Sequence, residues 1–236
     1  MIVQTRGIVL HSTKYSDTSL VVKIYTEAAG TLSFIIKGVF SKKSKIRASL
    51  FSPLSIVNIT FDDHKEGLKY LKEISREDYT SDVLYDPAKS AILMFYGELL
   101  SKLLFEAGQD TILFDFLQNE ILRIYDEGTN LAELPLSFLI RLSVVLGHFP
   151  ENNYSDSSCY FSLEECRFQP YHIDPRTEIP KEESLYLYQL MNGEAPASIS
   201  RDIRNNLLHY LIEYYKIHNE QIKKIESVEI LSSILH

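Results

Sequence analysis

A short basic stretch, KGVFSKKSKIRA at residues 37–48, carries the clearest chemical signal in the sequence. Its five cationic side chains, with no acidic one among them, are Lys37, Lys42, Lys43, Lys45 and Arg47. Like charges this close together repel one another and the segment is too polar to pack, so it predicts a flexible loop. Binding to phosphates would offset the repulsion, because each neutralised phosphate releases counterions. The stretch therefore favours contact with nucleic acid.

A simpler interpretation is that these lysines are only solvated and keep a neighbouring edge strand from pairing with another chain. The distribution of charge favours the first interpretation. Residues 1–60 hold eight Lys or Arg and two acids, a net charge of +6, whereas residues 81–236 hold twelve Lys or Arg and 24 acids, a net charge of −12. The net charge of −8 for the whole chain conceals a basic region that would attract polyanions.

The sequence does not indicate catalytic or metal chemistry. It contains no phosphate-binding loop of the pattern GxxxxGK[ST] or GxGxxG, no GxSxG elbow and no HExxH pair. Cys159, Cys166 and His172 could be imagined as metal ligands, but a structural zinc site needs four closely spaced donors. We therefore expect no enzyme activity and no cofactor.

Composition and the N-terminal segment bear on the compartment. The chain is 45% hydrophobic and 24% charged, as in an ordinary globular protein, and its two cysteines are too few for a disulfide framework. The first residues lack the apolar segment of a signal peptide, and no run of about 18 apolar residues could span a bilayer. We expect a cytoplasmic protein with no membrane contact.

The elements around the basic stretch read as strands, because apolar residues alternate with polar ones. The expected strands are residues 2–12, 18–26, 31–38 and 53–61, and residues 67–75 are ambiguous between strand and helix. Gly30 suits a short turn with positive φ, and Leu54 and Ile56 are out of phase with Val57, which predicts a bulge or sharp bend. Five short antiparallel strands in such a length favour a small closed barrel.

The hydrophobic period changes to that of a helix from Asp86 onward. The expected helices are residues 86–108, 110–128, 134–150, 180–191, 200–218 and 228–236, with Asp86, Asp110 and Ser200 as N-caps. Residues 150–180 lack periodicity and contain four prolines, which predicts a long irregular insertion. The fold class is thus α+β and multidomain: a β-barrel domain at residues 1–80, then an all-α helical domain at residues 81–236.

Two segments resemble the RecO family of bacterial recombination mediator proteins. The first is GIVLHSTKYSDTSLVVKIYTEAAGTLSFIIKGVFSKKS at residues 7–44. It has an S-[DE]-x-[ST] turn, a T-E-x-x-G strand end, and the segment K-G-[AV]-x-[SR]-x-[KR]-[SR]. The second is LSFLIRLSVVLGHFP at residues 136–150, which is similar to an apolar family helix with a central Arg that ends in L-G-h-x-P.

The resemblance implies an N-terminal OB-fold that binds single- and double-stranded DNA, followed by a helical domain. It also implies annealing of complementary strands in RecF-pathway DNA repair and association with RecR. Contact with the C-terminal tail of single-stranded DNA-binding protein would help to load RecA. Such a protein would be associated with the nucleoid.

The chain departs from the family pattern in two places. Many members carry four zinc-binding cysteines after the third helix, whereas SSCYFSLEECRFQP at residues 157–170 keeps two, so no metal is expected. Some relatives place a base just before the apolar helix to hold the partner's tail, but Ser137 stands near that place here. Arg141, one turn further on, would either bind this tail or pair with a neighbouring carboxylate.

The leading hypothesis is a non-enzymatic, DNA-binding recombination mediator. The side chains expected to follow the phosphate backbone are Arg6, Lys37, Lys42, Lys43, Lys45 and Arg47. Exposed aromatic residues such as Tyr15, Tyr25 or Phe40 would stack on bases without reading their sequence. The alternative is a protein-interaction adaptor, in which the basic barrel binds an acidic protein partner.

Overall fold

The computed structural model describes residues 1–41, 46–63, 67–76, 86–148, 150–194 and 199–235. The chain forms two compact units, Met1–Glu127 and Gly128–His236. No helix in the described ranges is long and apolar enough to cross a membrane.

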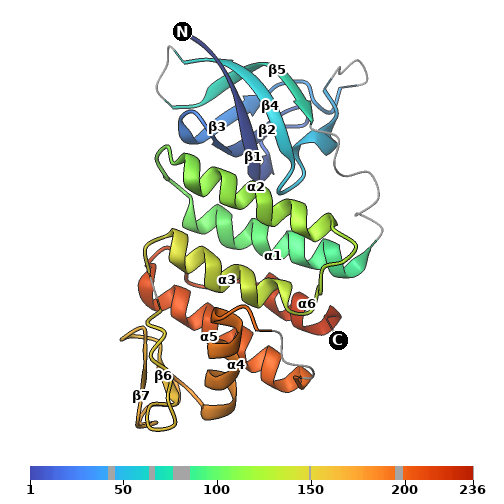
Figure 1. Cartoon of the computed structure of the whole chain (residues 1–236). Helices are drawn as coiled ribbons and strands as arrows, with labels where there is room; N and C mark the ends of the chain where they lie inside the picture. The colour runs from blue at the N-terminus through green and yellow to red at the C-terminus, as the bar shows by residue number, and fades with distance from the viewer. Residues whose placement is uncertain (42–45, 64–66, 77–85, 149, 195–198, 236) are drawn as a thin grey trace. The chain divides into compact units, whose positions relative to one another are not determined.

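The first unit contains a closed five-stranded barrel with the order β1-β2-β3-β5-β4 (Figure 1). Its strands are β1 (Ile2–Lys14), β2 (Leu20–Thr26), β3 (Gly30–Ile36), β4 (Ile56–Asp62) and β5 (Lys69–Arg76). The predicted OB-like barrel is confirmed, and the ambiguous residues 67–75 are strand. The prediction that all five strands are antiparallel is wrong, because β3 and β5 pair in parallel where the barrel closes.

Two local backbone features of the barrel follow the sequence predictions. Gly30, the first residue of β3, has φ +69°, and a Cβ atom there would clash with the carbonyl oxygen of Ala107. Leu54, two residues before β4, has φ +60°, so the predicted sharp bend is confirmed. Inside the barrel, Phe34 and Phe61 meet edge to face with ring centroids 5.3 Å apart, and both are fully buried.

The first unit also contains the helices α1 (Pro87–Leu103) and α2 (Thr111–Tyr125). The carboxylate of Asp86 accepts from the N–H of Ala88 at 2.9 Å, and that of Asp110 accepts from Leu113 N–H at 3.0 Å. Both predicted N-caps are therefore present, and they satisfy amides that a helix start leaves without a partner.

The described residues of the second unit form four helices: α3 (Leu134–Val145), α4 (Lys181–Met191), α5 (Arg201–His218) and α6 (Ser227–Ile234). The hydroxyl of Tyr215 on α5 donates to the carbonyl oxygen of Leu139 on α3 at 2.7 Å and is buried there. Ser200 caps α5 by accepting from Ile203 N–H, as its sequence position predicts.

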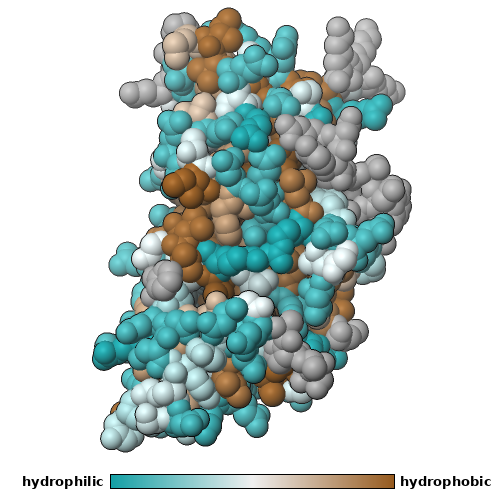
Figure 2. Space-filling model, in the orientation of Figure 1, coloured by the Kyte–Doolittle hydropathy of each residue, from teal (hydrophilic) through white to brown (hydrophobic). Residues whose placement is uncertain are grey.

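Residues 150–180 also contain a small antiparallel sheet, so the prediction of a wholly irregular insertion is corrected. Its strands β6 (Tyr160–Ser162), β7 (Arg167–Gln169) and β8 (Glu178–Ile179) have the order β7-β6-β8. These strands have only two or three residues, too few for a periodic pattern to show. The surface over β6 and β7 is mainly hydrophilic to neutral on the face drawn in Figure 2.

Polar side chains fix this sheet in place. The Ser184 hydroxyl accepts from Phe161 N–H and donates to the carbonyl oxygen of Ile179, both at 2.9 Å, which ties β6 and β8 to α4. On the edge of β7 that faces away from β6, the Asn153 amide accepts from Phe168 N–H at 2.8 Å and donates to Phe168 C=O at 3.0 Å. The insertion is thus held by hydrogen bonds and packing.

Candidate nucleic-acid interface

The basic residues predicted to bind phosphates are only partly covered by the structure. Lys42, Lys43 and Lys45 lie outside the described residues. Lys37 directly follows β3, and Arg47 directly precedes a 3-10 helix at Ala48–Phe51. Both side chains are exposed, and neither forms an ion pair with another residue in the described part of the chain. Because both side chains are exposed, a ligand in solution can reach them.

Tyr70 lies beside Lys37, and sequence reasoning did not single it out. Parallel pairing of β3 and β5 places Tyr70 opposite Ile35, two residues before Lys37. The ammonium of Lys37 is 5.2 Å from the centroid of the Tyr70 ring. The preceding residue, Lys69, obscures the pattern, because it is buried and pairs with Asp63 at 2.6 Å. From the sequence alone, a lysine at position 69 would be expected in solvent. The alternation of residues 69–71 therefore does not predict whether Tyr70 points into the barrel or outward.

Two of the three aromatic residues proposed for base stacking are exposed. Tyr15 is 66% exposed and Phe40 is 46% exposed, as expected. The expectation for Tyr25 is wrong, because its side chain is fully buried and its hydroxyl donates to the carbonyl oxygen of Asp110 at 3.1 Å. Burial raises the pKa of Tyr25 to about 12, which keeps the phenol protonated. Tyr25 packs the barrel against the start of α2.

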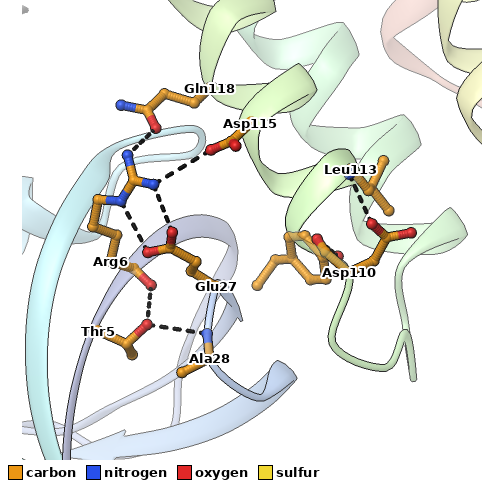
Figure 3. Close-up of polar contacts among 9 residues, drawn as sticks. Thr5, Arg6, Glu27, Ala28, Asp110, Leu113, Asp115 and Gln118 are labelled. Carbon is orange, nitrogen blue, oxygen red and sulfur yellow. Dashed lines mark hydrogen bonds and ion pairs between the residues drawn. The ribbon is translucent and has the colours of Figure 1, made fainter.

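Arg6 points toward α2 and binds three polar side chains (Figure 3). Its Nε and Nη2 atoms donate to the two carboxylate oxygens of Glu27 at 2.9 and 2.7 Å. Nη1 donates to Gln118 Oε1 at 2.6 Å, and Nη2 also lies 3.3 Å from Asp115 Oδ1. A guanidinium has five N–H donors, so at most one is left for a phosphate. Contact between Arg6 and DNA stays a prediction.

The hydrogen bonds from Arg6 also set the charge state of their acceptor. They lower the pKa of Glu27 below its ordinary value, because they stabilise the carboxylate more than the neutral acid. The guanidinium carbon lies 5.1 Å from the centroid of the Phe114 ring on α2. Arg6 therefore joins β1 to the β2–β3 turn and to α2 within the first unit.

Arg141 lies on α3 and is half-buried. Its Nη2 atom is 3.5 Å from the hydroxyl oxygen of Ser137, one turn earlier on the same helix. This contact does not show whether Arg141 binds a partner's tail or pairs with a carboxylate of its own chain. Both interpretations stay predictions.

The two cysteines are free thiols in the second unit. Cys159 is buried, and the sulfur of Cys166 lies 3.4 Å from His218 Nε2 and 3.7 Å from the Tyr214 hydroxyl. The ring of His172 stacks on Tyr160 with centroids 5.3 Å apart. No three His, Cys, Asp or Glu side chains of the described ranges are grouped so as to hold a metal ion.

Family models and curated relatives match the chain along almost all of its length. The model for the recombination protein O N terminal matches residues 1–78, and the model for the recombination protein O C terminal matches residues 84–225. Proteins named DNA repair protein RecO are similar over 99% of this chain and 99% of their own length. Those of Bacteroides fragilis and Phocaeicola vulgatus are 31% identical to it, and that of Flavobacterium psychrophilum is 29% identical.

Proposed function

Because the chain belongs to the recombination protein O (RecO) family, we propose that it acts in DNA repair as a non-enzymatic mediator of recombination. The observation that carries this proposal is the family match over the whole chain, combined with an OB-like barrel that exposes Lys37 and Arg47. These two residues flank the part of the basic stretch that contains Lys42, Lys43 and Lys45. A dense group of cations on a small barrel suits binding to phosphates.

The proposed activity is annealing of complementary strands. Two single strands repel each other through their phosphates, and a basic surface that holds both would screen this repulsion. Pairing then becomes faster although no covalent bond is made or broken. The exposed rings of Tyr15 and Phe40 would contact bases without selecting a sequence, which suits a protein that must act on any strand.

We further propose that the protein works with the partners expected for the family. Association with RecR, and capture of the acidic, apolar C-terminal tail of single-stranded DNA-binding protein, would bring it to coated single strands on nucleoid DNA. RecA could then be loaded there. Arg141 is the proposed contact for the carboxylates of this tail, because an Arg side chain binds a carboxylate with charge-assisted hydrogen bonds.

The salt dependence of DNA binding tests the role of the basic stretch. Simultaneous replacement of Lys42, Lys43 and Lys45 by Ala should weaken binding to a labelled single strand. It should also reduce the slope of log affinity against log salt by about 2, since each lost phosphate contact contributes roughly 0.7. The control replaces three exposed lysines of the second unit, Lys181, Lys223 and Lys224, and should retain the slope. An unchanged slope in the first variant would refute the proposed role.

The alternative function is an adaptor whose basic barrel binds an acidic protein. The exposed cations Lys37 and Arg47 favour it as much as they favour DNA, because any polyanion can neutralise them. Competition between an oligonucleotide and an acidic peptide of equal charge separates the two functions. Stronger binding of the peptide at every salt concentration would support the adaptor.

A further inference from the structure

Tyr70 presents its ring to solvent on the outside of the barrel. It is the second residue of β5, and 49% of its surface is exposed. The next residue, Leu71, packs against the hydrophobic core of the barrel. Because successive side chains of a strand point to opposite faces, the ring of Tyr70 points outward.

The ring lies where the basic stretch begins. β3 pairs with β5 at Ile35 and Tyr70, and the chain leaves β3 after Ile36 with Lys37 as the first cation. Gly38 then turns the chain with φ +72°, and Ser41 N–H donates to Gly38 C=O at 3.0 Å. A nucleotide whose base contacts Tyr70 would therefore have its phosphate close to Lys37.

The contact between Lys37 and Tyr70 can be exchanged for contacts with a ligand. Its length of 5.2 Å is near the outer limit for a cation–π interaction, whereas the amino group of Lys23 lies only 3.1 Å from the centroid of the Phe105 ring. The Lys37 side chain is exposed. Its ammonium can move to a phosphate, which leaves the face of the ring to a base.

We propose that Tyr70 is a stacking platform for one unpaired base and makes the barrel favour single strands over duplex. This inference rests on the proposed function and deepens it. An aromatic ring stacks on any unpaired base, so the contact adds affinity without adding sequence preference. In a duplex both faces of each base are already stacked on neighbouring bases, and the ring has no face to bind. Lys37 contributes equally to both forms, because it contacts phosphate.

Equilibrium binding distinguishes stacking from charge. Tyr70→Leu keeps an apolar side chain and removes the ring, so affinity for a single strand should fall about 5- to 150-fold while affinity for duplex changes less than twofold. The conservative variant Tyr70→Phe should restore single-strand affinity. Tyr171→Leu, at a tyrosine of the second unit that is 69% exposed, is the matched control. Retained duplex binding by the Leu variant shows that it is folded.

Fluorescence gives a second, independent readout, because the chain contains no tryptophan. Tyr70→Trp creates a single indole whose emission should be quenched when oligo(dT) binds. An oligonucleotide of abasic sites, which has phosphates but no bases, should bind without this quenching. Tyr171→Trp should keep its emission with both ligands. Anisotropy of a labelled oligonucleotide measures binding in parallel.

The outcomes separate this inference from the proposed function. Two results would overturn the stacking role alone. One is that Tyr70→Leu binds single strands with wild-type affinity, and the other is that the emission of Tyr70→Trp is not quenched when it is saturated with oligo(dT). Equal losses for single strand and duplex in Tyr70→Leu would also overturn it. If the unmodified protein changed the anisotropy of neither form of DNA, the proposed function and this inference would both be wrong.

Discussion

Glu120 and Arg123 lie one turn apart on α2, with Arg123 Nη1 3.4 Å from Glu120 Oε2. Only 6% of the Glu120 side chain is exposed, against 39% for Arg123. Burial raises the pKa of Glu120 to about 7, although the positive charge of Arg123 opposes this shift. The carboxyl group is therefore close to half-protonated at neutral pH.

The raised pKa of Glu120 predicts that stability depends on pH. Between the ordinary pKa of 4.5 and about 7, the folded protein holds a proton that the unfolded chain has released. The stability due to the neutral acid is complete below the unfolded pKa and is lost as pH rises through the folded pKa. The free energy of unfolding should fall by roughly 3 kcal/mol across this window, since each pKa unit corresponds to about 1.4 kcal/mol.

Glu120→Gln should abolish this decline, because the amide cannot ionise. Urea denaturation followed by circular dichroism should find the variant more stable than wild type at pH 8. The control Glu213→Gln, at an exposed ion pair with Lys216, should keep the wild-type pH profile. If the free energy of unfolding of Glu120→Gln fell with rising pH as much as that of the wild type, another group would be the cause.

The contacts of Arg6 predict that this residue stabilises the first unit. Arg6→Met removes the hydrogen bonds to Glu27, Gln118 and Asp115 and should cost about 1 to 2 kcal/mol at neutral pH, since the pair is about one-third exposed to screening solvent. The pKa of Glu27 is lowered, so this stability is present above the unfolded pKa and is lost as pH falls through the folded pKa. Denaturation of both proteins at pH 7 and pH 3 should therefore show a smaller difference at pH 3. If the free energies of unfolding of the two proteins differed equally at pH 7 and pH 3, the substitution would affect packing alone.

The same variant tests the prediction that Arg6 contacts DNA. If Arg6 holds the barrel to α2 and makes no phosphate contact, Arg6→Met should bind a single strand with the salt dependence of the wild type. A slope reduced by about 0.7 would instead assign one phosphate to this side chain. Arg47→Met, at an exposed cation of the basic stretch, should show that reduction and is the comparison.

Gly30 is expected to tolerate no side chain. Gly30→Ala would force a positive φ on alanine and drive its Cβ into the carbonyl oxygens of Ala107 and Gly108, so we expect a loss of more than 2 kcal/mol. Gly38→Ala shares the positive φ, but among the described residues its Cβ would meet only the Ser41 hydroxyl at 3.8 Å. It should therefore lose about 1 kcal/mol. Equal melting temperatures for the two variants would contradict the steric argument.

The proposed role of Arg141 can be tested with a peptide. Arg141→Gln should weaken binding of a labelled peptide with the C-terminal tail of single-stranded DNA-binding protein about tenfold or more, as expected for loss of a hydrogen bond between charged groups. Arg167→Gln, at an exposed arginine of β7, should bind as wild type. If Arg141 pairs with a carboxylate of its own chain instead, the Gln variant would be less stable but would bind the peptide with wild-type affinity.

The sequence predicts those elements that have enough residues to show a period or a recognisable cap. The alternation of Leu20, Val22 and Ile24 is long enough to identify β2, and Asp86 and Asp110 mark helix starts because their carboxylates bind free amides. The short strands β6, β7 and β8 lack such a signal. Parallel pairing of β3 with β5 is also hidden, because it joins segments far apart in the chain.

The candidate site is less predictable than the fold, because exposure depends on which face a strand presents. Tyr25 reads as a surface aromatic next to Lys23, yet contacts with Asp110 and Phe114, more than 80 residues later, bury it. Arg6 reads as a free cation, yet residues far along the chain supply its acceptors. Tyr70 becomes notable only through its neighbour in space, Lys37.

The amide of Asn153 has a consequence for how the molecule behaves at high concentration. An open strand edge is a template on which a second chain can add a strand, and chains linked in this way form aggregates. At Phe168, the position that such a chain would need is already taken by a side chain that mimics a peptide bond. Replacing Asn153 by a residue without an amide would leave that edge open to self-association.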